Sequence, residues 1–439
     1  MSHVVRKSLE EYQSGAARGD AEDMLELGLC YLEGAGGASP DPARAYQWIE
    51  KAAQTGHPRA LYNLSYLLYA GLGVPADGKA ARETLAQAAE AGDPQAAQSL
   101  GASYALGDGA PRDDQKAFYW LRRAAAAGDL IANYQMGLFY SLGERGIAKN
   151  PSLAAAYFRQ AADGKLVEAE YNLALLLWRG EGVPANAEES FRLFLDAAQR
   201  GFPPAASWVA NAYEEGRGVL PSPEEALDWR RKAAASGDID SAILLSRKYY
   251  AGDGVAEDPQ ESFRWLKMAA ERGDPLSQLD LAALYESGEI EGRDLERAFH
   301  WLSQAAASGA PEAHFRLGLF LLGGARGPEK VAEGTRLLER AAAAGLPEAL
   351  TELGRVFWTG AGAPEDPERA ISLWEKAARL DDSLARYRLA MAYAFFRENA
   401  EDWRKGLSLA RELAGEGYPQ AAELAEKIVA QRGELCGDP

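Results

Sequence analysis

The stretch DSAILLSRKYYAGDGVAEDPQESFRWLKMAAERG, residues 240–273, contains the features that decide the fold of this chain. It ends at Gly273, which lies three residues after Ala270. Glycines in the same context recur every 36 or 37 residues along the chain, at Gly56, Gly92, Gly128, Gly164, Gly201, Gly237, Gly273, Gly309 and Gly345. The same period extends to Gly19, Asp381 and Gly417, so eleven units of about 36 residues fill 20–418. This regularity predicts a solenoid instead of several globular domains.

Each unit is expected to contain two helices. Apolar and small residues follow a helical period in both halves of a unit, as in 95–109 and 116–128. An N-cap residue followed by proline marks many helix starts, at Asp41, Asp93, Asn150, Ser222, Asp258, Asp274 and Asp366. The periodic glycine then closes the second helix in a left-handed conformation, with Asp381 as the one departure.

Small residues indicate how closely the helices approach. The first helices carry a large apolar residue directly before a glycine, as in Leu100-Gly101, Met136-Gly137 and Leu353-Gly354. Tryptophans of the second helices are predicted to be core residues: Trp48, Trp120, Trp229, Trp265 and Trp301. The glycine-rich connectors between the helices follow a helix and lack the Gly-Lys-Ser/Thr of a phosphate loop, so they are interpreted as tight turns.

Composition excludes several classes of function. The chain of 439 residues has a formal net charge of −18, which disfavours nucleic acid and anionic membranes as partners. Two cysteines and four histidines leave little material for disulfides, metal sites or proton transfer, and Cys30 is expected to be a buried apolar residue. No apolar run reaches the roughly 18 residues of a membrane span. We therefore expect a cytoplasmic protein with no catalytic residues, no metal and no cofactor.

The repeat pattern also resembles a known family. The order Ala-x-x-x-Leu-Gly-x-x-Tyr-x-x-Gly-x-Gly-Val, then Asp, then Ala-x-x-Trp-x-x-x-Ala-Ala-x-x-Gly is similar to the Sel-one-like repeat, a relative of the tetratricopeptide repeat; 95–128 and 240–273 follow it closely. The resemblance implies an all-α, right-handed α/α superhelical solenoid with the first helices on its concave side. The connector 323–328 and the segment 396–405, which lacks glycine, depart most from the pattern.

The two ends of the chain are expected to cap the stack. Residues 1–19 contain an apparent lone second helix, and 419–439 contain a closing helix followed by a short tail with Cys436. Open-ended repeat stacks need such terminal covers.

By analogy with tetratricopeptide units, certain positions of the first helix face the groove. These positions lie two before, two after and five after the apolar residue that precedes the small one, and an amide directly before it often grips a peptide backbone. The candidate partner-binding residues are Tyr62, Asn63, Tyr66, Tyr134, Tyr171, Asn172, Trp178, Trp208, Asn211, Tyr250, Phe315, Trp358 and Tyr387. The alternative interpretation is that many of them only pack against the next helix.

The charge pattern suggests bipolar recognition of another protein. The acidic chain favours a basic partner, whereas Arg247, Arg316, Arg355 and Arg388 lie on first helices of the later units. The sequence predicts a non-catalytic protein-interaction scaffold or adaptor that binds a partner segment or domain in its groove. Two alternatives remain: an immunity or inhibitor protein that neutralises a toxin or enzyme, and, less favoured, a hydrolase-like enzyme.

Overall fold

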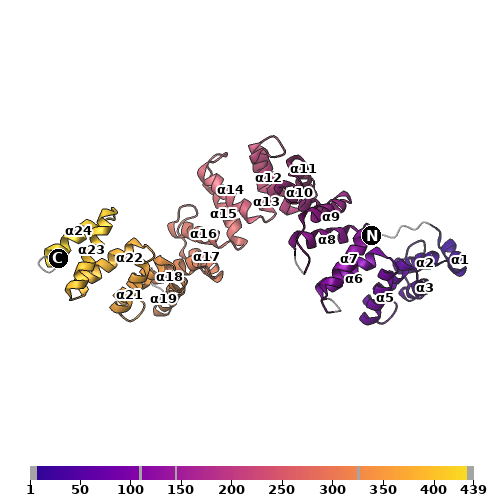
Figure 1. Ribbon diagram of the computed structural model, residues 1–439, viewed down its shortest axis with the longest axis horizontal. Coiled ribbons are helices and arrows are strands. Elements are labelled where there is room, and N and C mark those ends of the chain that lie inside the picture. Colours follow the sequence, from indigo (N-terminus) through magenta and orange to yellow (C-terminus); the bar gives the residue numbers. More distant parts are fainter. Residues whose placement is uncertain (1–6, 108–110, 144–145, 324–326, 433–439) are drawn as a thin grey trace. The chain divides into compact units, whose positions relative to one another are not determined.

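The computed structural model describes residues 7–107, 111–143, 146–323 and 327–432. Within these ranges every regular element is a helix, and the helices follow one another as tandem pairs (Figure 1). The chain divides into two compact units, unit 1 (Met1–Ala233) and unit 2 (Ala234–Pro439). The predicted all-α solenoid of helix pairs is therefore confirmed. Cys436 and part of the connector 323–328 lie outside the described residues.

Most helices are 13 residues long, and the even-numbered helices from α2 to α22 are the first helices of their pairs. The helices that begin in unit 1 are α1 (Leu9–Ala17), α2 (Ala21–Glu33), α3 (Pro42–Gln54), α4 (Pro58–Ala70), α5 (Gly78–Glu90), α6 (Pro94–Leu106), α7 (Asp114–Ala126), α8 (Leu130–Leu142), α9 (Pro151–Asp163), α10 (Val167–Arg179), α11 (Ala187–Gln199), α12 (Pro203–Glu215) and α13 (Pro223–Ala235). Those of unit 2 are α14 (Ile239–Ala251), α15 (Pro259–Glu271), α16 (Pro275–Ser287), α17 (Leu295–Ala307), α18 (Pro311–Gly323), α19 (Pro328–Ala343), α20 (Pro347–Thr359), α21 (Pro367–Ala378), α22 (Ser383–Met391), the π-helix η1 (Ala392–Phe396), α23 (Ala400–Gly415) and α24 (Ala421–Arg432).

The predicted helix starts are confirmed by hydrogen bonds at the caps. The Asp93 carboxylate accepts from the Ala96 N–H at 2.7 Å, and the Asp258 carboxylate accepts from the N–H groups of Gln260 and Glu261, both at 3.0 Å. These bonds satisfy N–H groups that have no partner inside the helix. Proline follows the cap in both α6 and α15, where its missing N–H costs nothing.

The closing glycines of the second helices adopt the left-handed conformation, with one exception that the sequence did not reveal. Gly237 has φ of 107° and Gly273 of 92°, and Asp381 takes φ of 62° as predicted. Gly164, however, has φ of −78°, and Lys165 takes the left-handed position with φ of 66°. The interval of 37 residues between Gly164 and Gly201 accounts for this shift by one residue. The prediction that Asp381 is the one departure is therefore wrong.

The core of each unit lies between helices of successive pairs. A first helix packs against the second helix of its own pair and that of the pair before, as α6 does with α7 and α5. Fully buried alanines allow this close approach, while Phe158 and Phe194 fill larger spaces in unit 1. Of the five second-helix tryptophans expected in the core, Trp120 and Trp229 are buried, whereas Trp48, Trp265 and Trp301 are only half-buried.

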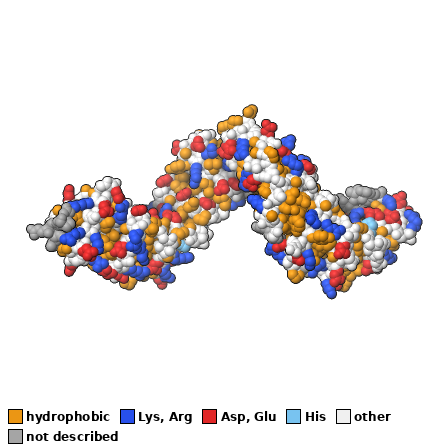
Figure 2. Space-filling model, viewed as in Figure 1, with side chains coloured by type: hydrophobic (Ala, Val, Ile, Leu, Met, Phe, Trp, Pro, Cys, Tyr) orange, Lys and Arg blue, Asp and Glu red, His pale blue; other side chains and the backbone are white. Residues whose placement is uncertain are grey.

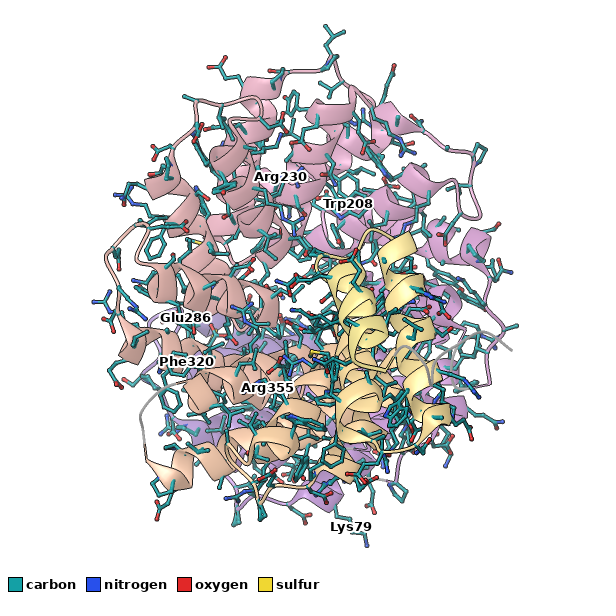
Figure 3. All side chains as sticks on the ribbon, turned by 90° about the vertical axis from the view of Figure 1, so that its left-hand side faces the viewer. Lys79, Trp208, Arg230, Glu286, Phe320 and Arg355 are labelled. Atoms are coloured by element: carbon teal, nitrogen blue, oxygen red, sulfur yellow. The ribbon has the colours of Figure 1, made fainter. Side chains whose placement is uncertain are left out.

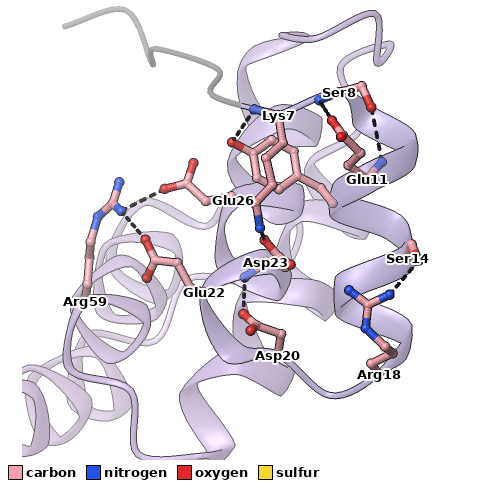
Figure 4. Close-up of polar contacts among 11 residues, drawn as sticks. Lys7, Ser8, Glu11, Ser14, Arg18, Asp20, Glu22, Asp23, Glu26 and Arg59 are labelled. Carbon is pink, nitrogen blue, oxygen red and sulfur yellow. Dashed lines mark hydrogen bonds and ion pairs between the residues drawn. The ribbon is translucent and has the colours of Figure 1, made fainter.

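Polar contacts fix α1, at the N-terminal end of the described chain, to α2 (Figure 4). Ser8 and Glu11 form a reciprocal capping box at the start of α1. The Lys7 ammonium lies 2.5 Å from the buried carboxylate of Asp23 on α2, and Tyr12 packs into the core beneath it. A helix thus stands at each end of the described chain, α1 against α2 and α24 against α23. That these helices act as caps remains a prediction.

Candidate functional site

The strongest candidate site is a pocket of about 640 Å³ in unit 2, formed mainly by α20, α22 and η1. We call it the α20–α22 pocket. Its lining consists of Arg355, Trp358, Thr359, Trp374, Leu384, Tyr387, Arg388, Met391, Ala392, Phe395 and Phe396. Trp358 and Tyr387, both proposed from sequence as groove residues, are brought together here.

The aromatic floor of the α20–α22 pocket depends on a glycine. Gly354 lies on α20, and a Cβ atom there would overlap the indole of Trp374 on α21. The Trp374 Nε1–H donates to the carbonyl of Thr351 at 3.0 Å, which fixes the ring against α20. The Trp358 ring lies 5.2 Å from that of Trp374 and 5.1 Å from that of Phe396, measured between centroids. These rings form one continuous apolar surface.

The π-helix supplies the outer wall of the pocket. The Arg397 N–H donates to the carbonyl of Ala392 at 3.2 Å, so the wider turn spans five residues. The Trp403 indole N–H donates to the Arg397 carbonyl at 2.7 Å and anchors the end of this turn. Phe395 and Phe396 are left 39% and 44% exposed, respectively. Large aromatic side chains with this exposure are available for contact with another molecule.

Two arginines from successive first helices share one carboxylate beside the pocket. The Nε of Arg355 lies 2.6 Å from one Glu352 oxygen, and an amino nitrogen of Arg388 lies 3.3 Å from the other. Burial lowers the pKa of the Arg388 guanidinium, while the negative charge of Glu352 opposes that effect. Figure 3 labels Arg355 on α20. Among the described lining residues of this pocket, the charged ones are both arginines.

A second pocket, of about 720 Å³, lies in unit 2 around α14 and α16; we call it the α14–α16 pocket. Tyr250, another candidate from sequence, stands at its edge with 72% of its surface exposed. The charged lining residues are Arg247, Asp274, Asp280 and Glu289. Burial raises the pKa of Asp280, and the positive charges of Arg316 and Arg247 oppose that rise. This pocket is therefore predominantly acidic.

Further along the same first-helix face, Glu286 of α16 lies 3.8 Å from Arg316 of α18. Burial raises the pKa of Glu286, and Arg316 opposes the rise (Glu286 is labelled in Figure 3). The first helices of unit 2 thus present charges of both signs.

The candidate tryptophans of unit 1 are packed inside the chain. Trp178 is only 6% exposed and contacts Phe194 and Trp208, and the Arg217 guanidinium lies 3.9 Å above its ring. Trp208 is half-buried and stacks on Phe194 with 5.5 Å between ring centroids. The expectation that Trp178 offers its side chain to a partner is wrong, because neighbouring helices cover it. Both residues extend the core of unit 1.

The candidate amides already make hydrogen bonds within the chain. The Asn63 and Asn172 side chains donate to carbonyls one turn earlier in their own helices, at 2.8 Å and 2.7 Å. The Asn211 side chain accepts from the Arg230 guanidinium at 2.6 Å. These amide groups stabilise their local structure.

The remaining candidate side chains differ in exposure. Tyr66 is 54% exposed, whereas Tyr62 is half-buried against the core of unit 1. The Tyr134 ring packs 5.9 Å from Phe158, and burial raises the pKa of its hydroxyl. Tyr171 packs against Phe194 and Phe202, and Phe315 is half-buried in unit 2. Among these five residues, only Tyr66 has more than half of its surface exposed to solvent.

The prediction that Cys30 is a buried residue is confirmed. Cys30 is buried, and burial raises the pKa of its thiol. Throughout 7–107, 111–143, 146–323 and 327–432, no three His, Cys, Asp or Glu side chains gather in a way that would hold a metal ion. In the same ranges, no helix has the length and apolar character needed to cross a membrane.

Sequence reasoning missed several residues of the α20–α22 pocket. Trp374 occupies the second-helix position that Leu121 holds in an earlier unit, so it looked like an ordinary core residue. Phe395 and Phe396 follow the last regular turn of the first helix and enter η1, which no repeat position predicts. The available signal was the connector 396–405, whose lack of glycine marks a departure at this place.

These features define the chain as an α-solenoid of tandem helix pairs with pockets on its first helices. Ten consecutive segments match the model of the Sel1 repeat: 21–57, 58–93, 94–129, 130–166, 167–202, 203–238, 239–274, 275–309, 311–346 and 347–382. The chain belongs to the Sel1 repeat family. The eleventh predicted unit, which contains α22, η1 and α23, lies beyond these matches and remains a prediction.

A solved structure with an SLR fold supports this assignment. The chain is similar to c5321, a protective antigen of uropathogenic Escherichia coli with an SLR fold, at 26% identity and a TM-score of 0.68, covering 99% of this chain and 98% of that one. A Sel1 repeat protein from Oxalobacter formigenes is also 26% identical, covering 56% of this chain and 96% of that one, with a TM-score of 0.46. The immunity protein Pa5087 from Pseudomonas aeruginosa is 19% identical, with coverage of 62% and 88% and a TM-score of 0.26. No curated protein matches the chain.

Proposed function

We propose that this protein is a non-catalytic interaction scaffold or adaptor that binds a segment of a partner protein on the first helices of its repeats. Sel1 repeats generally mediate contacts between proteins. The observation that carries the proposal is that the α14–α16 and α20–α22 pockets both open on first helices and present an aromatic residue at the same repeat position. Tyr250 lies five residues after Leu245, and Trp358 lies five residues after Leu353.

Charge supports a protein partner with groups of both signs. The α14–α16 pocket has three carboxylates and one arginine in its lining, which favours a basic residue of the partner. Acidic and basic side chains are interspersed over the visible surface of each unit (Figure 2). Binding that depends on such exposed charges weakens as salt shortens the Debye length below about 10 Å.

The test is affinity capture: the purified full chain is the bait, and a lysate of the cells that make the protein supplies the partner. We expect one protein to be retained in stoichiometric amount, and retention to fall with added salt. The double variant Tyr250→Ala and Trp358→Ala should lower the affinity at least about tenfold, because both pockets lose an aromatic contact. Tyr119→Ala is the matched control, since Tyr119 is an exposed aromatic residue on the second helix α7.

Absence of an enriched protein would count against an interaction role. Equal losses of affinity for the partner in the double variant and in Tyr119→Ala would count against the first helices as the binding surface. Circular dichroism of each variant separates lost binding from lost folding.

A further inference from the structure

The α20–α22 pocket has the size and surface to receive a large apolar side chain. Its volume of about 640 Å³ falls within the range of roughly 300–1,000 Å³ found for ligand pockets. Leu384 and Met391 on α22 are 38% and 37% exposed, and they adjoin the partly exposed Phe395 and Phe396. An apolar group that enters here would cover several exposed side chains at once, which is the pattern of a binding hot spot.

The charge beside this pocket is opposite to that of the chain as a whole. Arg355 and Arg388 both form ion pairs with the single carboxylate of Glu352. The nearby Asp382 carboxylate caps α22 by accepting from the Ala385 N–H at 2.6 Å. The planar guanidinium forks of two arginines match the geometry of a carboxylate. In a protein of net charge −18, a pocket whose charged lining is arginine selects an anionic group.

The source of that carboxylate follows from the donors at the pocket. Chain-terminal carboxylates are commonly held by unpaired backbone N–H groups. Here every lining residue except Leu384, in the first turn of α22, lies far enough into α20, α21, α22 or η1 for its backbone N–H group to bond inside the helix. Side-chain guanidiniums are therefore the available donors, and they favour an acidic side chain within an extended segment.

We propose that the α20–α22 pocket is the anchor site for an acidic-apolar segment of the partner protein. A large apolar side chain of the segment packs against Trp358 and the rings of η1, and an adjacent Asp or Glu carboxylate binds Arg355 and Arg388. This assignment rests on the proposed interaction function and specifies the chemistry of one of its sites.

The test measures binding of short fluorescent peptides to the full chain by anisotropy. The peptides are N-acetylated and C-amidated and contain one tryptophan next to Glu, Gln or Lys. We expect the Glu peptide to bind at least about tenfold more tightly than the Gln peptide, and the Lys peptide more weakly still.

The chain offers matched controls outside the pockets for both parts of the site. Trp358→Ala should weaken binding of the Glu peptide at least about tenfold, whereas Tyr119→Ala, which removes an exposed aromatic ring from the second helix α7, should leave it unchanged. Arg355→Gln should remove most of the preference for Glu over Gln, whereas Arg264→Gln should not; Arg264 pairs with Glu261 three residues earlier, as Arg355 does with Glu352. Arg355→Glu should shift the preference toward the Lys peptide.

Equal affinities for the Glu and Gln peptides would overturn the proposal. So would binding that requires a free C-terminal carboxylate in place of the amide. If a captured partner is lost with Tyr250→Ala but not with Trp358→Ala, the interaction function stands and this anchor site is wrong. If no partner is captured and no peptide binds, both fail.

Discussion

Glycines in the middle of first helices determine how closely each helix pair approaches. A Cβ atom on Gly137 would lie 2.5 Å from the ring of Phe158, and one on Gly101 would lie 2.7 Å from Leu121. The same relation holds between Gly354 and Trp374. Each glycine thus provides the space for one large side chain of the second helix, as the adjacent large and small residues in the sequence predicted.

Gly137→Ala should therefore destabilise unit 1. Overpacking against the rigid ring of Phe158 is expected to cost about 1–3 kcal/mol. Native-state hydrogen exchange should show reduced protection in α8 and α9. Gly78→Ala is the control: no atom lies within 4 Å of its added Cβ, and the change should be neutral or stabilise by up to about 1 kcal/mol. Similar losses in both variants would contradict this role of Gly137.

The buried histidine of α18 predicts a loss of stability in mild acid. Burial lowers the pKa of His314 below its ordinary value of 6.5, and the charge of Arg340 acts in the same direction. The unfolded chain consequently binds a proton more readily than the folded one. The stability that neutral His314 contributes is present above pH 6.5 and is lost as pH falls through the lowered pKa.

His314→Gln removes this titration. Between pH 7.5 and 5.5, the stability of unit 2 should fall less steeply in the variant than in the native chain, as measured by hydrogen exchange. Unit 1 serves as the internal control, because His314 lies in unit 2. Identical pH dependence of unit 2 in both proteins would show that burial of this imidazole does not alter its titration.

At the scale of an element, the end of each second helix depends on one residue with positive φ. Glycine usually takes that position, but after α9 the extra residue of the repeat places Lys165 there with φ of 66°. A side chain in this conformation costs about 1 kcal/mol relative to glycine. Lys165 is also 3.7 Å from the carboxylates of Glu170 and Asp196, which offers partial compensation.

Two substitutions of Lys165 separate the cost of its backbone conformation from the effect of its ammonium charge. Lys165→Gly should be more stable than Lys165→Ala by about 0.5–1 kcal/mol, because both lose the ammonium group but only glycine relieves the backbone. Hydrogen exchange at the end of α9 and the start of α10 would measure the difference. A more stable alanine variant would mean that the left-handed conformation is not costly here.

How much of the site could be predicted from sequence also becomes clear at this scale. The repeat positions predicted two residues that line the α20–α22 pocket, Trp358 and Tyr387, because a regular first helix fixes the direction of the side chains at those positions. They failed for Trp178, which neighbouring rings bury, since repeat position alone does not report the size of adjacent side chains. They also failed for Phe395 and Phe396, because η1 breaks the helical period on which the positions depend.

At the scale of the whole molecule, each helix pair is stabilised by its contacts with the neighbouring pairs. In a repeat stack, each element gains most of its stability from adjacent elements. The end of unit 2 shows this connection: Ile428 and Leu424 of α24 are buried in one cluster with Leu407 of α23 and Ala394 of η1. The closing helix therefore supports the π-helix that forms a wall of the α20–α22 pocket.

Ile428→Ala should loosen this end of unit 2 and the pocket together. Ile428 is fully buried, and its truncation is expected to cost about 2–5 kcal/mol. Val429 is 43% exposed on the same helix, so Val429→Ala should change stability by less than about 0.5 kcal/mol. Hydrogen exchange should show lost protection in η1, α23 and α24 for Ile428→Ala alone, with unit 1 unchanged. Protection that falls equally in both units would instead mean that the chain unfolds as one cooperative body, against nearest-neighbour stabilisation.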